Sequence, residues 1–210
     1  WIPEFKEDKS LSFQDVCNQS EFLIKKSIEK KLISDVPISL SLSGGIDSSI
    51  LAGIITKNFN KKITSFSLID QAKYNEESLI KDTGNFLDLK TNRIKIKYRN
   101  FLQNLKYIID YHNEPIPTIT YFVQNFLTSA VGKKNFKILI SGTGADELFT
   151  GYYDHFLQFF ATINNLKERQ KNINEWKKFV VPLLKNKSLK KTFRYINNKK
   201  DRSNIYDGYK

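Results

Sequence analysis

A chain of 210 residues with a formal net charge of +12 is long enough to bury a core in one domain, or in one domain and part of another. It contains no run of about 18 apolar residues, so neither a membrane-spanning helix nor a membrane partner is predicted. The single cysteine, Cys17, excludes an internal disulfide and a paired-cysteine metal site, and it favours a reducing compartment, the cytoplasm.

The positive charge admits a nucleic-acid partner, but most lysines are dispersed among Asn and Ile, so such a partner is not expected. Residues 161–210 are the exception, and a helical, partly disordered basic segment is favoured there over an RNA-binding one. Its basic residues include Lys185, Lys187, Lys190, Lys191, Arg194, Lys199, Lys200 and Arg202. The absence of any methionine predicts that the chain is an excised portion of a longer protein.

Residues 1–34 are predicted to form a helical lead-in. Ser12 and Asp15 have the spacing of a capping box, and the helix that they start is expected to run to about Leu32. Apolar residues at helical spacing predict a face packed in a core, with Cys17 buried as an unreactive thiol. These residues are Phe13, Val16, Ile24 and Ile28.

Residues 35–160 alternate between apolar strand-like segments and helical segments. Strands are expected at 36–42, 63–68, 93–97 and 136–140, and helices at 46–59, 75–86, 101–111 and 119–131. This order predicts an α/β fold, a doubly wound parallel sheet with helices on both faces, in which 93–97 lies near an edge. A helical segment is expected from about residue 148 onward.

The loop Ser43-Gly44-Gly45-Ile46-Asp47-Ser48-Ser49 joins the first strand to its helix. A Gly-Gly turn at this junction leaves backbone N–H groups unpaired, and the helix dipole adds positive charge. The hydroxyls of Ser43, Ser48 and Ser49 can donate to phosphate oxygens, and Asp47 can hold a divalent cation. An ordinary capped turn does not account for this combination of residues, so the loop predicts pyrophosphate binding.

A second glycine-containing loop, Ser141-Gly142-Thr143-Gly144-Ala145-Asp146-Glu147, follows the fourth strand. Its two glycines allow a ligand to approach the backbone, and its two acids open a helix whose dipole they complement. An acidic N-cap turn would explain the acids but not both glycines. Asp146 is placed to share Mg²⁺ with Asp47. Whether the two loops are neighbours depends on a strand order that the sequence leaves open.

The two loops together resemble the glutamine-dependent asparagine synthetase family of the ATP-pyrophosphatase superfamily. Ser141 to Tyr152 is similar to its SG(E/D)G(A/S/G)DE(L/V)FGGY motif, and the segment from Ser39 to Ser49 is similar to LSGG(L/I)DSS. Three further elements follow the order and approximate spacing of the family: Phe66-Ser67-Leu68, Tyr74-Asn75-Glu76 and Glu114-Pro115. The resemblance covers about 35–160, the synthetase domain, and implies an adenine nucleotide alpha-hydrolase-like fold.

This resemblance implies that a carboxylate, aspartate in the family, attacks the α-phosphorus of ATP, and that ammonia then converts the adenylate to asparagine and AMP. It assigns Mg²⁺ to Asp47 and Asp146 and a catalytic role to these two residues and Glu147. It assigns pyrophosphate to Ser43, Gly44, Gly45, Asp47 and Ser48, and adenosine to Leu42, Leu68, Ser141 and Gly142. For the two leucines, packing in the strand core is an equally good interpretation.

The family's glutaminase domain begins with a catalytic cysteine. Cys17 does not match that cysteine, so the glutaminase domain is expected in the full-length protein and this chain alone is not expected to hydrolyse glutamine. The basic residue that the family uses for adenylation is expected beyond Lys210 or absent.

Three residues depart from the family pattern. Thr143 stands where the family has Glu or Asp, so either Glu147 or Glu114 replaces that acid or the acceptor is not aspartate. Asn75 replaces an Asp, and Thr150 replaces a Gly, which is expected to be tolerated on a helix. The alternatives are a tRNA-modifying ATP-pyrophosphatase and a degenerate module that binds ATP without catalysis.

Overall fold

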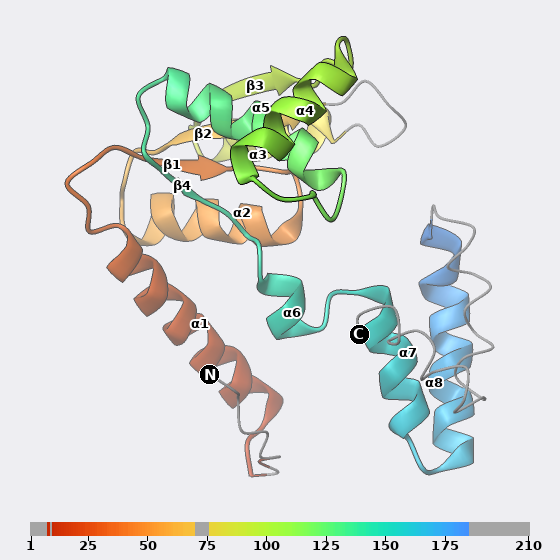
Figure 1. Cartoon of the computed structure of the whole chain (residues 1–210). Helices are drawn as coiled ribbons and strands as arrows, with labels where there is room; N and C mark the ends of the chain where they lie inside the picture. The colour runs from red at the N-terminus through yellow and green to blue at the C-terminus, as the bar shows by residue number, and fades with distance from the viewer. Residues whose placement is uncertain (1–7, 9, 70–75, 185–210) are drawn as a thin grey trace. The chain divides into compact units, whose positions relative to one another are not determined.

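A computed structural model describes residues 8, 10–69 and 76–184 (Figure 1). Contacts divide the chain after Gly142 into two compact units, 1–142 and 143–210. The limits expected for a synthetase domain, 35–160, stay a prediction, because a division by contacts does not delimit a functional domain.

The first unit is built on a parallel sheet with the strand order β3-β2-β1-β4. Leu40 in β1 pairs with Ser65 on one side and with Ile140 on the other, so β1 is central. The strand β3 lies at an edge, as predicted. The bounds are β1 Ile38–Ser41, β2 Thr64–Ile69, β3 Lys90–Lys95 and β4 Ile138–Ile140.

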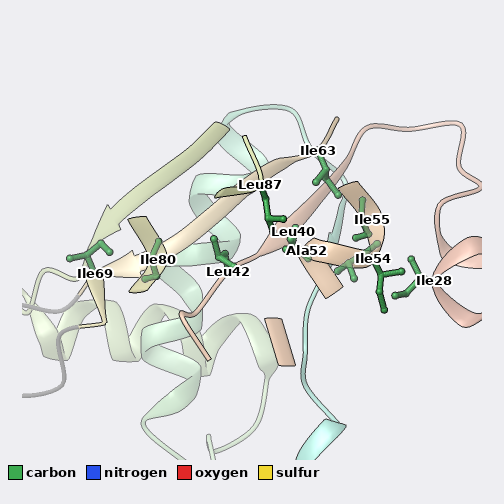
Figure 2. Close-up of a cluster of buried hydrophobic side chains, with 11 residues drawn as sticks. Ile28, Leu40, Leu42, Ala52, Ile54, Ile55, Ile63, Ile69, Ile80 and Leu87 are labelled. Carbon is green, nitrogen blue, oxygen red and sulfur yellow. The ribbon is translucent and has the colours of Figure 1, made fainter. Parts of the chain in front are cut away.

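One face of the sheet is covered by α2 (Ile46–Gly53), its π-helical continuation (Ile54–Asn58) and α3 (Glu77–Phe86). Figure 2 shows Leu40 of β1 beside Ala52 of α2, in one cluster with Ile55 of the π-helical continuation and Ile80 of α3. Leu40, Ala52 and Ile55 are completely buried. The helix expected at 46–59 is thus present, with a π-helical last turn.

The opposite face is covered by α5 (Thr120–Lys133), and α4 (Phe101–His112) packs against α5. Phe66 of β2 is completely buried there against Leu127 and Val131. Side chains from both faces of the sheet are therefore buried under helices, which confirms the doubly wound α/β prediction.

The helix α1 (Phe13–Lys31) begins at the predicted capping box. The Asp15 N–H donates to Ser12 Oγ at 3.2 Å, and the Ser12 N–H donates to Asp15 Oδ2 at 3.0 Å. Only the C-terminal part of this helix reaches the core, where Ile28 is buried.

The prediction of a buried Cys17 is wrong, since this thiol is exposed. Phe13 is 84% exposed, and Val16 is exposed as well. Helical spacing identifies a face of α1 correctly, but the core of the sheet contacts only the last turns of that face.

The second unit contains α6 (Ala145–Phe149), α7 (Tyr153–Thr162), α8 (Leu166–Phe179) and a 3₁₀ turn (Val181–Leu183). Its core is formed by α7 and α8 through Leu157, Phe160, Ile173 and Trp176. The helical prediction beyond residue 148 is confirmed in this range, and the basic residues from Lys185 to Arg202 lie outside the described residues. None of the described helices is long and apolar enough to cross a membrane.

Thr150 is not on a helix, which corrects the expectation from sequence. It caps the C-terminus of α6 in the left-handed conformation, with φ 61° and ψ 43°. A β-branched residue is disfavoured there because its side chain crowds the backbone. Asparagine, which tolerates this conformation, occupies four of the other left-handed positions among the described residues: Asn60, Asn100, Asn113 and Asn135.

Replacing Thr150 with glycine should therefore stabilise the protein. We expect Thr150→Gly to raise the free energy of unfolding by about 0.5–1 kcal/mol, because the relieved left-handed strain exceeds the added freedom of the unfolded chain. Urea denaturation followed by circular dichroism measures this change. Thr150→Ala, which keeps a Cβ atom, is the control and should gain less. An equal gain from both variants would contradict the explanation.

Candidate functional site

Strand order brings the first glycine-containing loop next to the start of the second, Ser141-Gly142, within the first unit. Because β4 pairs with β1 in parallel, Leu42 and Ser141 leave the sheet at the same edge. From β1 the chain continues to β2, which pairs with one side of β1, whereas β4 pairs with the other side of β1. Ligands of doubly wound sheets bind at such a switch point, beyond the carboxyl ends of the strands.

The end of β4 touches the start of α2. A Cβ atom on Gly142 would lie 2.9 Å from Asp47 Cβ and 3.2 Å from the Ser48 backbone nitrogen. These distances leave no room for a side chain, so a glycine is needed for the close approach. The structure therefore brings Gly142 next to Asp47 and Ser48, three residues that the sequence singled out.

The serines of the first loop hydrogen-bond within the loop. The Ser43 N–H donates to Ser48 Oγ at 3.1 Å, and the Gly45 N–H donates to Ser43 Oγ at 3.3 Å. The hydroxyls of Ser48 and Ser49 both donate to the Gly45 carbonyl, at 3.1 and 2.8 Å. Ser48 is buried, whereas Ser43 is exposed. These bonds hold the loop in one shape, and direct contacts of the hydroxyls with pyrophosphate stay a prediction.

Gly44 gives the loop its turn and brings a further residue close. Its φ of +76° is a left-handed conformation, and a Cβ atom there would lie 3.2 Å from Glu76 Cβ and 3.3 Å from Leu79 Cβ. Glu76 belongs to the Tyr74-Asn75-Glu76 element that resembles the family pattern, but the sequence assigned it no role of its own. Tyr74 and Asn75 lie outside the described residues.

The N-terminus of α2 has the features of an anion site. Its N-cap, Gly45, is extended and makes no side-chain cap bond, and Asp47 is in the first turn of the helix. First-turn N–H groups and the helix dipole favour a negatively charged ligand at this end.

The residues present fit a magnesium ion that is bound together with a phosphate ligand. Within the described part of the chain, no group of three or more His, Cys, Asp or Glu residues gathers as a metal site. Magnesium commonly takes one or two carboxylates and completes its shell with water and substrate phosphates. Asp47, half-buried in the loop 43–49, suits such a site.

The two leucines assigned to adenosine are packing residues. Leu42 is buried in the core beneath α2, and its N–H donates to the Phe66 carbonyl at 2.9 Å. Leu68 is half-buried against the core around Phe66. Contacts of their backbones, and of Ser141 and Gly142, with adenosine stay predictions.

Asp146 and Glu147 lie in the first turn of α6, in the second unit. The Tyr152 hydroxyl donates to Glu147 Oε1 at 2.7 Å, and this hydrogen bond lowers the pKa of Glu147 below its ordinary value. The same bond raises the pKa of Tyr152. Glu147 is therefore a weaker base than an ordinary glutamate. The sequence motif includes Tyr152 but assigned it no role, and the sharing of a metal by Asp146 and Asp47 stays a prediction.

A separate cleft of about 560 Å³ lies between α4 and α5. Tyr107, Tyr111, His112 and Tyr121 are among its lining residues, and none of the predicted site residues lines it. It is therefore distinct from the loop 43–49.

Comparison with known proteins gives a family match over most of the chain. The model of the asparagine synthase family matches residues 20–204. The chain is similar to asparagine synthetase [glutamine-hydrolyzing] 1 of Bacillus subtilis (strain 168), with 29% identity over 156 residues, 70% of this chain and 24% of that protein. It is also 27% identical over 157 residues to a putative asparagine synthetase [glutamine-hydrolyzing] 2 of Methanocaldococcus jannaschii, covering 73% of this chain and 30% of that one.

The chain thus spans about a quarter of the length of the curated relatives that it matches. Among solved structures, it aligns with an NH3-dependent NAD synthetase from Campylobacter jejuni, covering 95% of this chain and 97% of that one. The sequence identity is 15% and the TM-score is 0.42, a likeness too distant to inform on function.

The close approach at Gly142 is testable by adding a methyl group. We expect Gly142→Ala to lower the free energy of unfolding by about 1–3 kcal/mol, because the new Cβ atom must displace the start of α2. Gly53→Ala is the matched control, since Gly53 is helical and a Cβ atom there meets nothing within 4 Å. It should gain about 0.5–1 kcal/mol. Urea titration measures both changes, and a Gly142→Ala variant as stable as the parent would disprove the close contact.

The hydrogen bond between Tyr152 and Glu147 sets a pH dependence. We expect Tyr152→Phe to raise the pKa of Glu147 towards its ordinary value, which carbon-detected NMR titration measures. In the parent, the lowered pKa contributes stability above the unfolded-state pKa, and this contribution is lost as pH falls through the folded-state pKa. In the variant, the free energy of unfolding should therefore fall less as the pH is lowered through this range. Tyr153→Phe is the control, because the Tyr153 ring packs against Trp176 instead, and it should leave the pKa of Glu147 unchanged.

Proposed function

Because the chain belongs to the asparagine synthase family, we propose that it carries the ATP-dependent, amide-forming site of a synthetase of this type. The observation that supports this most strongly is the contact of Gly142 with Asp47 at the switch point between β1 and β4. It joins a preorganised phosphate-type loop, a helix N-terminus and a carboxylate at one edge of the sheet.

We propose that the reaction has two steps. A carboxylate oxygen attacks the α-phosphorus of ATP, the bond from this phosphorus to the bridging oxygen breaks, and pyrophosphate leaves. Ammonia nitrogen then attacks the acyl carbon, the carbon–oxygen bond to AMP breaks, and the nitrogen loses a proton. The loop from Ser43 to Ser48 would hold the leaving pyrophosphate, and its fixed shape means that little reorganisation is needed as charge develops.

We assign magnesium binding to Asp47 and Asp146. The bound ion would neutralise charge on the pyrophosphate oxygens. Asp47 is the better supported of the two, because it lies beside the loop in the same unit.

Aspartate is the first candidate for the acceptor carboxylate, with ammonia supplied by a glutaminase domain of the full-length protein in the cytoplasm. Thr143 favours a second candidate, a different carboxylate, because a neutral hydroxyl cannot act as a general base. Glu147 does not readily replace the missing acid as a base, since its pKa is lowered by Tyr152.

The test uses the full-length parent protein with Mg-ATP, ammonium chloride and a panel of carboxylates headed by aspartate. We expect pyrophosphate and AMP to be released in equal amounts, in step with the amide. Release of pyrophosphate and AMP only with another carboxylate would support the same two-step mechanism with an acceptor other than aspartate. No AMP with any acceptor, despite measurable ATP binding, would instead support a degenerate ATP-binding module.

Asp47→Asn should lower the rate of pyrophosphate release by about 10²-fold or more, because charge on the leaving group loses its stabilisation. Asp82→Asn, an exposed carboxylate on α3, is the matched control and should leave the rate unchanged. Equal rates for the unsubstituted protein and Asp47→Asn would disprove the assignment of this site.

A further inference from the structure

The chain turns back sharply after α6, so that Gly151 lies against Asp146. The Gly151 N–H donates to the Asp146 carbonyl at 3.0 Å. A Cβ atom on Gly151 would lie 3.1 Å from Asp146 Cβ and 2.6 Å from its Cγ, and the carboxylate oxygen Oδ1 is nearer still. The carboxylate of Asp146 therefore occupies the space that a side chain at position 151 would fill.

The backbone of Gly151 does not itself require glycine. Among the described glycines, only Gly44 and Gly144 have a positive φ. An alanine could adopt the backbone conformation of residue 151, but its Cβ atom would push the Asp146 carboxylate out of its present position. The requirement for glycine at this position thus comes from the aspartate and not from the turn.

The next residue holds the neighbouring acid. The Tyr152 hydroxyl donates to Glu147 Oε1 at 2.7 Å. Tyr152 is the N-cap residue of α7, its carbonyl accepts from the His155 N–H at 3.1 Å, and the two rings are 5.3 Å apart. The phenol is thus anchored to a helix start.

From these contacts we propose that Gly151 and Tyr152 are positioning residues for the acid pair Asp146 and Glu147. Gly151 acts by leaving space for one carboxylate, and Tyr152 acts by hydrogen-bonding the other. The proposal rests on the metal-binding role assigned to Asp146 above. The space at Gly151 accommodates the Asp146 carboxylate where it now lies, so a side chain at position 151 would change the direction from which that carboxylate can reach a cation.

The first test needs no ligand. We expect Gly151→Ala to lower the unfolding midpoint of the full-length protein, measured by urea titration. In an Asp146→Ala background, where Cγ and both carboxylate oxygens are gone, the same change should lower it much less. Equal losses in both backgrounds would show that residue 151 acts on something other than Asp146, and would overturn the proposal.

The second test measures affinity for the manganese complex of α,β-methylene-ATP by calorimetry. We expect Asp146→Ala and Gly151→Ala each to weaken binding by about 10–100-fold, the range found when groups that orient a metal ligand are removed. The double variant should bind no more weakly than Asp146→Ala alone. Tyr152→Phe should change affinity less than twofold, because Tyr152 hydrogen-bonds Glu147 and not Asp146. It should lower the rate of AMP release, because the Glu147 carboxylate is no longer held in place, and an unchanged rate would overturn the positioning role of Tyr152.

The outcomes separate this proposal from the proposed function. If Asp146→Ala binds the manganese–nucleotide complex as tightly as the unsubstituted protein does, Asp146 does not bind the metal. Gly151 then cannot act by positioning Asp146 towards that metal. If Asp146→Ala weakens binding but Gly151→Ala does not, the metal role of Asp146 is kept and the positioning role of Gly151 is disproved. Additive losses in the double variant would also overturn the positioning role.

Discussion

The pairing of β4 with β1 is the constraint on which the rest of the site depends. A parallel pair starts both strands at one edge and ends them at the other, so the loop after β1 and the chain after β4 leave the sheet together. The order β3-β2-β1-β4 makes this pair the switch point of the sheet. Without this pairing, Gly142 and Asp47, far apart in sequence, would not meet.

The phosphate-type loop is shaped by its own side chains before any ligand is considered. Three serine hydroxyls and the Gly45 carbonyl form a closed set of hydrogen bonds, and Gly44 supplies the left-handed turn against Glu76. A loop held this way has few alternative shapes to lose when an anion binds. The serines therefore contribute through the order they give the backbone, whichever of them also contacts a phosphate.

Sequence periodicity predicted the elements because each buries a face of its own, as Phe66 and Leu40 do on opposite faces of the sheet. It did not predict strand order, which depends on contacts between residues such as Leu40 and Ile140. It failed for Cys17 because spacing cannot tell how far a core extends along a helix. It failed for Thr150 because a left-handed cap is a property of the turn, and the family pattern, with glycine there, was the better guide.

Each of the two aspartates assigned to magnesium lies against a glycine. Gly142 faces Asp47, Gly151 faces Asp146, and at both glycines a Cβ atom would come within 3 Å of the aspartate side chain. Neither glycine has a positive φ, so each is required for the space that it leaves. The two approaches differ in what they touch. Gly151 lies against the carboxylate of Asp146 itself, whereas Gly142 lies against Asp47 Cβ and the backbone of Asp47 and Ser48, where α2 begins. Through the space that each leaves, these glycines contribute to the packing around the two aspartates to which we assign magnesium.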